Sequence, residues 1–134
     1  MAKSSGIGMT VTIDDADGTG RAISNDTTQI SFNTSRGVQD VTGVNSSAME
    51  RLLLLNDFNC TLTTVFNPAA APSMIAVLST PADNDTRTVV IVVGGKTMTA
   101  ECHMTDVSWS RNADGSFTAQ ATFMQSSTTA AAWS

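Results

Sequence analysis

Apolar and polar residues alternate with a period of two through much of this chain. Met9, Val11 and Ile13 alternate with threonines near the N-terminus, and residues 117–123 alternate in the same way. This pattern is typical of strands with one buried face and one solvated face. Further strands are expected at residues 29–32, 38–41, 60–66 and 86–93, and from Lys96 onward. We therefore expect a mainly β fold, either a β-sandwich or a partly closed β-barrel.

Two turn sequences and one change of phase organise the later strands. Gly94-Gly95 predicts a two-residue hairpin turn, and Asn112-Ala113-Asp114-Gly115 predicts a second hairpin. Between the two turns, apolar residues occupy even positions up to Met104 and odd positions from Val107. One extra residue near Thr105-Asp106 explains this shift, which is the signature of a β-bulge. Residues 34–37 predict another bulge or a tight turn.

One short α-helix is expected at residues 46–55, on the flank of the β domain. Asn45 or Ser46 is a candidate N-cap, Met49 or Glu50 follows about three residues later, and four leucines come after Arg51. Leu52 and Leu55 share a helical face with Ala48, so the helix is buried on more than one side or packs on a neighbouring subunit. A helix that plugs one end of its own barrel is the alternative. A shorter helix, capped by Ser73, is expected at 73–78.

The chain is expected to form one domain, residues 1–134, because 134 residues suffice for a single core and leave no room for a second. Residues 14–27 are rich in Asp and Gly and are expected to form a surface loop. Residues 126–134 are Ser, Thr and Ala with Trp133, and predict a flexible or partner-bound C-terminal arm.

Charge and composition narrow the classes of function. Charged residues make up 14% of the chain, the net charge is −5 and the isoelectric point is near 4.4. Seven scattered basic residues argue against a domain that grips nucleic acid, since phosphate binding needs clustered Lys and Arg. The acidic balance is compatible with a surface past which DNA slides without sticking. A low share of charge suits assembly with other subunits.

No catalytic, metal or cofactor site is expected. His103 is the single imidazole, and it shares a polar strand face with Glu101 without an identifiable nucleophile. Asp14 to Gly18 resembles a calcium loop only in its acids and glycine, because the twelfth position holds Asn25. Cys60 and Cys102 lack metal-ligand spacing and are expected to be buried free thiols, or a disulfide if their strands are neighbours.

The N-terminus lacks the apolar core of a signal peptide, and no stretch approaches the roughly 20 apolar residues that span a bilayer. We therefore expect a protein made and folded in the cytoplasm, with no membrane partner.

Several of these segments together resemble a known family. Asp40-Val41-Thr42, then Arg51, then the alternating run from Cys60 to Phe66 stand in the order of the middle of the major tail tube proteins of long-tailed, siphovirus-type bacteriophages. The hairpin at 112–115 is similar to the closing hairpin of that family. The resemblance covers most of residues 28–126.

This resemblance implies a structural virion protein of the phage tail, without enzymatic activity. Family members form hexameric rings that stack, meet other tail proteins, and enclose a lumen through which DNA passes during ejection without specific binding. The hairpins 28–41 with 60–66 and 96–111 with 116–125 are the candidates for lining that lumen. Loop 14–26 and the C-terminal arm are candidates for contacts between rings. The assembly interface is expected at Leu52, Leu54, Leu55 and Trp133.

Two alternatives remain open at this point. One is a different phage structural subunit, such as a tail terminator or a capsid decoration protein. The other is a binding β-sandwich module, which needs an exposed aromatic platform. Two Trp, no Tyr and 5% aromatic residues make such a platform hard to build.

Overall fold

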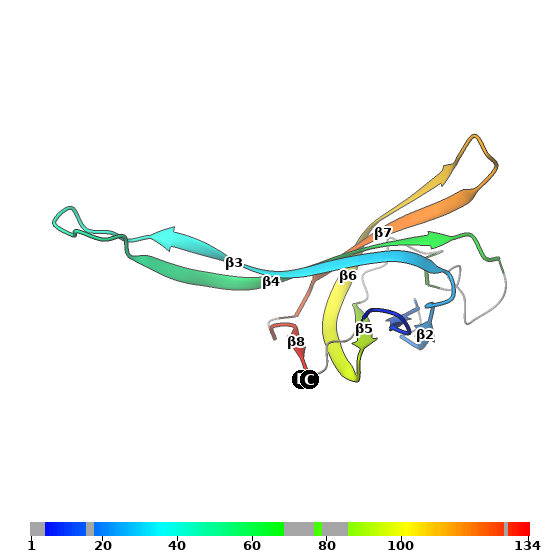
Figure 1. Ribbon diagram of the computed structural model, residues 1–134, viewed down its shortest axis with the longest axis horizontal. Coiled ribbons are helices and arrows are strands. Elements are labelled where there is room, and N and C mark those ends of the chain that lie inside the picture. Colours follow the sequence, from blue (N-terminus) through cyan, green and yellow to red (C-terminus); the bar gives the residue numbers. More distant parts are fainter. Residues whose placement is uncertain (1–4, 16–17, 69–76, 79–85, 128) are drawn as a thin grey trace.

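The computed structural model describes residues 5–15, 18–68, 77–78, 86–127 and 129–134, and within them the fold is antiparallel β. The strands belong to a single open sheet in the order β2-β1-β5-β6-β7-β4-β3, and β8 pairs with β6 (Figure 1). The predicted mainly β architecture is confirmed. The strands are β1 (Thr10–Asp14), β2 (Gly20–Ala22), β3 (Thr27–Asp40), β4 (Arg51–Val65), β5 (Arg87–Val93), β6 (Lys96–Arg111), β7 (Phe117–Gln125) and β8 (Ala132–Trp133).

The core lies inside the curl of this sheet. In Figure 1 the end of the sheet that carries β2 and β5 bends back beneath the long ribbon of β3 and β4. Buried residues from both ends of the sheet form one cluster, so the curl closes the core although the hydrogen-bonded sheet stays open. The alternation along β4, β6 and β7 supplies most of the cluster, including Phe58, Cys60, Leu62, Met98, Cys102, Ala119, Ala121 and Phe123.

Both predicted hairpin turns and both predicted bulges are present. Gly94 and Gly95 have φ values of 58° and 80°, and join β5 to β6 in a two-residue turn. The pairing of β6 with β7 shifts between Met104 and Asp106, and the pairing of β3 with β4 shifts between Arg36 and Val38. The first bulge lies where β6 leaves β5 and continues with β7, so it redirects the strand between two parts of the sheet.

The α-helix predicted at residues 46–55 is wrong. Residues from Arg51 onward belong to β4, where Leu53 pairs with Val38 and Arg51 pairs with Asp40 of β3. The capping sequence before them lies in the turn of this hairpin, which Val41 N closes by donating to Glu50 O at 3.0 Å. Helix propensity is a weak prior, and pairing with a strand distant in sequence overrides it here.

The segment at 14–27 is also more than a surface loop. Its residues Gly20–Ala22 form β2, which pairs with β1, and Ile23 is fully buried in the core. Of the second expected helix, Ser73 lies outside the described residues, while Val77 and Leu78 are helical and buried.

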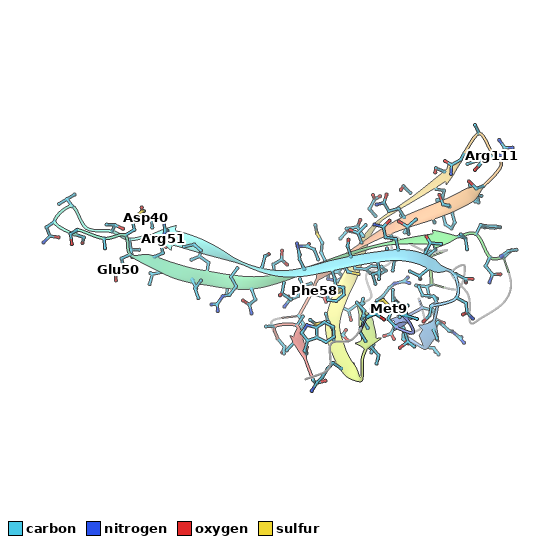
Figure 2. The ribbon with its side chains drawn as sticks, viewed as in Figure 1. Met9, Asp40, Glu50, Arg51, Phe58 and Arg111 are labelled. Carbon is cyan, nitrogen blue, oxygen red and sulfur yellow. The ribbon has the colours of Figure 1, made fainter. Side chains whose placement is uncertain are left out.

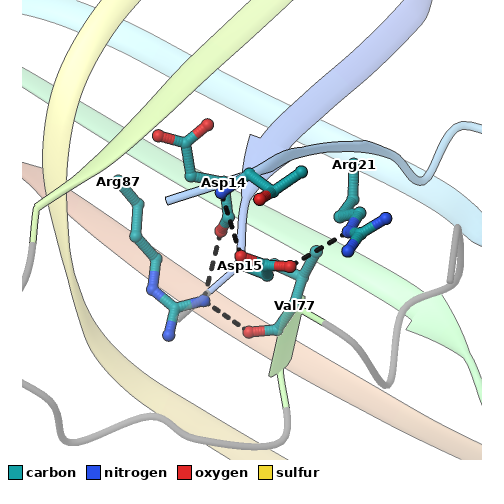
Figure 3. A network of polar contacts seen from close by, with 6 residues as sticks. Asp14, Asp15, Arg21, Val77 and Arg87 are labelled. Carbon is teal, nitrogen blue, oxygen red and sulfur yellow. Dashed lines mark hydrogen bonds and ion pairs between the residues drawn. The ribbon is translucent and has the colours of Figure 1, made fainter. Parts of the chain in front are cut away.

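A buried arginine holds this part of the body together (Figure 3). Arg87 Nη1 donates to the carbonyl oxygen of Val77 at 2.5 Å and to that of Asp14 at 3.3 Å. Arg21 Nε forms an ion pair with Asp15 Oδ2 at 3.0 Å beside it. A buried guanidinium is tolerated because it is hydrogen-bonded, and here it ties Val77 to the end of β1.

Candidate assembly interface

A two-stranded arm, residues 35–57, projects from the body. Phe58 of β4 is fully buried, whereas every residue from Arg51 to Asp57 is exposed. Figure 2 places Phe58 at the root of the arm and Asp40, Glu50 and Arg51 at its far end. An isolated two-stranded hairpin is marginally stable in water, so an arm of this length needs another surface to pack on.

Four consecutive leucines make this arm apolar. The exposed fraction of Leu52 to Leu55 runs from 44% at Leu54 to 90% at Leu55. Successive side chains of a strand point to opposite faces, so the run presents apolar groups on both faces of the arm. Continuous apolar runs are typical of strands that are buried on both sides. The arm therefore has the character of a docking element, and Leu52, Leu54 and Leu55 lie together on it.

The arm also contributes to a groove. An open hollow of about 1080 Å³ lies between the arm and the C-terminal segment, and its lining includes Arg36, Leu53, Leu54, Gln125 and Ala130. Gln125 Nε2 donates to the carbonyl oxygens of Ser127 and Thr129 at 2.9 and 3.0 Å. These hydrogen bonds fold the C-terminal segment, which forms the wall of the groove opposite the arm. The structure thus brings the leucines and the residues after β7 to one place.

Trp133 lies elsewhere, on β8 beside β6. It pairs with Met98 of β6, and its ring lies 5.8 Å from the ring of Phe32. Ser134 N donates to Thr97 O at 2.8 Å, so the end of the chain continues along the edge of β6. About half of the indole is exposed, but it is separate from the arm leucines. A role for Trp133 between subunits stays a prediction.

Sequence reasoning missed an exposed aromatic cluster formed by Phe66, Trp109 and Phe117. The ring centroids are 5.1 to 6.3 Å apart, with Trp109 and Phe117 stacked, and each side chain is 38% to 42% exposed. Trp109 and Phe117 flank the predicted turn at 112–115, so the predicted hairpin already indicates that these two side chains lie close together. Phe66 joins them only because β4 lies beside β7.

The four-stranded region of β3, β4, β7 and the second half of β6 has one polar face. Alternation places the core residues on one side, and on the other side hydroxyl, amide and carboxylate side chains together with the apolar Val65 and Met124. The strand positions on this polar face carry acids but neither Lys nor Arg. They include Gln29, Ser31, Asn33, Asp57, Asn59, Thr61, Thr63, Asp106, Ser108, Thr118, Gln120 and Thr122.

The same region has two strand edges without a partner among the described strands. β3 is the last strand in the sheet order, and β6 beyond Met104 pairs with β7 alone. An edge as long as β3, with 14 residues, is a template for pairing with another chain.

The remaining candidate chemistry stays dispersed. His103 is exposed on the face predicted for it, and neighbouring Glu101 accepts a hydrogen bond from the Thr88 hydroxyl. The described residues contain no group of three or more His, Cys, Asp or Glu side chains placed to hold a metal ion, and no described helix is long and apolar enough to cross a membrane.

Cys60 and Cys102 are buried free thiols, as expected. Both strands pair with β7, which therefore lies between them. Burial raises the pKa of the Cys60 thiol to about 12. Burial, followed by the charges of Cys60, Glu101 and Asp57, raises the pKa of Cys102 to about 12. Both thiols therefore stay protonated and unreactive at neutral pH.

Comparison with solved structures matches the whole chain. A chain in the tail of an empty gene transfer agent particle, obtained with helical refinement and C6 symmetry, superposes with a TM-score of 0.73 over 98% of this chain and 99% of that one. The two chains therefore share a fold. A chain in the virion of a native gene transfer agent particle gives 0.71 over the same shares, and both are 13% identical in sequence. No protein-family model and no curated protein sequence matches.

Proposed function

We propose that this protein is the tube subunit of a phage-like tail, a structural and non-enzymatic component of the virion. In this proposal six copies form a ring, rings stack into a tube, and DNA leaves through the lumen. The observation that carries it is the combination of an exposed apolar arm with two open strand edges, in a fold shared along its whole length with a chain of a C6-symmetric tail. The subunit would be made in the host cytoplasm and end in the tail, where it meets other tail proteins.

The two open edges support ring closure. Since β3, β4, β7 and β6 are successively antiparallel, the open strands β3 and β6 run in opposite directions. The β3 edge of one copy can therefore pair antiparallel with the second half of β6 in the next copy. Repetition of this heterologous contact by rotation closes a ring and removes both edges.

The polar face supports the assignment of the lumen. The core of each subunit packs on the other face of the four-stranded region, so the polar face is the one left to line an inner barrel. The hydroxyl and amide groups keep this face hydrated, and the negative charges of Asp57 and Asp106 repel the phosphate groups of DNA. The absence of Lys and Arg from these strand positions removes the charges that would hold DNA by counterion release.

The test is negative-stain electron microscopy of the purified protein over a range of concentrations, beside its sedimentation velocity. Hollow rings of six subunits and tubes built from them are expected. Rings that never stack would point to a tail terminator and contradict a tube subunit. A strictly monomeric protein at every concentration would contradict self-assembly and favour a binding module.

A further inference from the structure

Two exposed apolar surfaces lie at opposite ends of β4. The leucine arm contains the first residues of the strand, and the aromatic cluster of Phe66, Trp109 and Phe117 lies just after its last residue. Figure 1 shows the arm leaving the body on one side and the β6–β7 hairpin rising from the other. Exposed apolar patches of this kind mark surfaces of protein contact.

The two surfaces cannot meet within one subunit. Leu53 and Phe66 are 13 positions apart in the chain, which in an extended strand amounts to about 43 Å. Two different patches on opposite ends of a molecule make a head-to-tail contact when copies are displaced along the line between them. Such a contact repeats without closing and extends an assembly in one direction.

We propose that the arm of each subunit docks on the aromatic cluster of a subunit in the adjacent ring, so that this contact holds stacked rings together. The inference rests on the proposed function and names the surfaces that connect one ring to the next. The partner is a second copy of this chain, because the chain itself carries both halves of an apolar match.

The chemistry of the two surfaces agrees. The register places Leu53 opposite Val38 and Arg51 opposite Asp40, so one face of the arm offers aliphatic groups with a guanidinium two positions away. Arg51 is exposed, and its Nη2 contacts Met49 Sδ at 3.3 Å. Aromatic rings accept both aliphatic groups and a guanidinium on their faces. The cluster is therefore suited to this arm.

The docking predicts the spacing of the rings. The contact requires a translation of about 43 Å along the strand, and strands in barrels tilt by about 35–45° from the axis. The axial rise between rings should therefore lie between about 30 and 35 Å. A helical reconstruction of the tube measures it directly, and a rise outside this range would contradict the contact.

Cross-linking tests the contact between copies. A Leu53→Cys chain and a Phe117→Cys chain are assembled together and oxidised, and a disulfide-linked dimer of the two is expected. Cys60 and Cys102 do not interfere because both are buried. The matched control replaces Phe117→Cys with Lys96→Cys, an exposed position on the β5–β6 hairpin. No dimer is expected from the control, and equal cross-linking of both mixtures would overturn the proposal.

A second variant separates stacking from ring formation. Phe117→Ala removes one exposed ring from the cluster and leaves both open edges intact. Six-subunit rings should persist by sedimentation while the pelletable tube fraction falls at least tenfold. Tubes as abundant as those of the wild type would overturn the docking and leave the ring intact. A wild-type protein that forms no rings would instead overturn the proposed function, and the docking with it.

Discussion

Phe58 marks the boundary between the part of β4 that stabilises the subunit and the part left for other molecules. Its ring is fully buried, and its centroid lies 6.1 Å from that of Phe32. On the arm side of Phe58 no residue of β4 is buried, and on the other side the buried positions alternate to Thr64. Substitutions on the two sides should therefore affect different properties.

Leu55→Asp should prevent the formation of tubes without unfolding the subunit. Leu55 is 90% exposed, so the free energy of unfolding of the monomer should change by less than about 0.5 kcal/mol. In a tube the carboxylate would be buried against apolar groups, which costs far more. Urea unfolding and electron microscopy measure the two effects.

The matched core variant is Phe123→Ala, since Phe123 is fully buried on the body side. It should lower the free energy of unfolding by about 3–5 kcal/mol, because it removes buried contacts and leaves a cavity. If Leu55→Asp lowered stability to the same extent, the arm would be part of the folded core.

The buried thiols predict a loss of stability at alkaline pH. Cys60 and Cys102 have a pKa raised from 9.0 to about 12, with burial as the first cause for both. Below pH 9 both states keep the protons, so the thiols add no pH dependence. Between pH 9 and pH 12 the unfolded chain loses protons that the folded chain retains, and stability falls.

The measurement is the urea midpoint across this pH range. The chain has no Tyr and only Lys3 and Lys96 as lysines, so few other groups titrate there. The double variant Cys60→Ala, Cys102→Ala should have a lower midpoint at pH 8 but a flatter decline above pH 9. An unchanged decline in the double variant would assign the effect to other groups.

At the scale of elements, the β5–β6 turn depends on backbone conformation alone. Both Gly94 and Gly95 lie in the left-handed region, which L side chains rarely adopt, and a Cβ added at Gly95 would meet nothing within 4 Å. A side chain at Gly95 would therefore destabilise the turn through its unfavourable φ angle and not through steric overlap.

Gly95→Ala should destabilise the subunit by about 1–2 kcal/mol, the cost of a left-handed residue with a Cβ. Gly94→Asn should be close to neutral, because two-residue hairpin turns of this kind favour Asn-Gly. Thermal unfolding of both variants tests the difference. Equal destabilisation would show that the turn needs glycine for another reason.

At the scale of the whole molecule, the body and the arm are separable. The core cluster contains no residue of the arm, residues 35–57. Ser35 and Asp57 face each other in the ladder, so a two-residue turn can join them. The fold of the body thus does not require the arm, whereas stacking as we propose it does.

Replacement of residues 36–56 by Asn-Gly should leave a folded subunit that forms no tubes. The thermal midpoint should stay close to that of the wild type, since no buried apolar contact is removed. Circular dichroism and electron microscopy measure the two outcomes. Tubes of normal length from this variant would exclude the arm from the assembly.

The sequence by itself determined the features that depend on neighbouring residues. Period-two alternation indicated the strands, Gly94-Gly95 and Asp114-Gly115 indicated the turns, and the phase change near Thr105-Asp106 located the bulge. Each is local because side-chain direction and allowed φ values follow from adjacent positions. The apolar character of Leu52, Leu54 and Leu55 predicts an interface whether these residues form a helix or a strand, and that role stays a prediction.

Only the tertiary structure decided what residues 46–55 become and which surfaces remain open. The capping residues and leucines satisfy a local helix pattern, yet pairing with β3 supplies backbone hydrogen bonds from residues that the local pattern does not include. The aromatic cluster and the two free edges likewise arise from strand order. Strand order depends on contacts between residues distant in sequence, and the alternation along a single strand does not indicate which strands lie beside it.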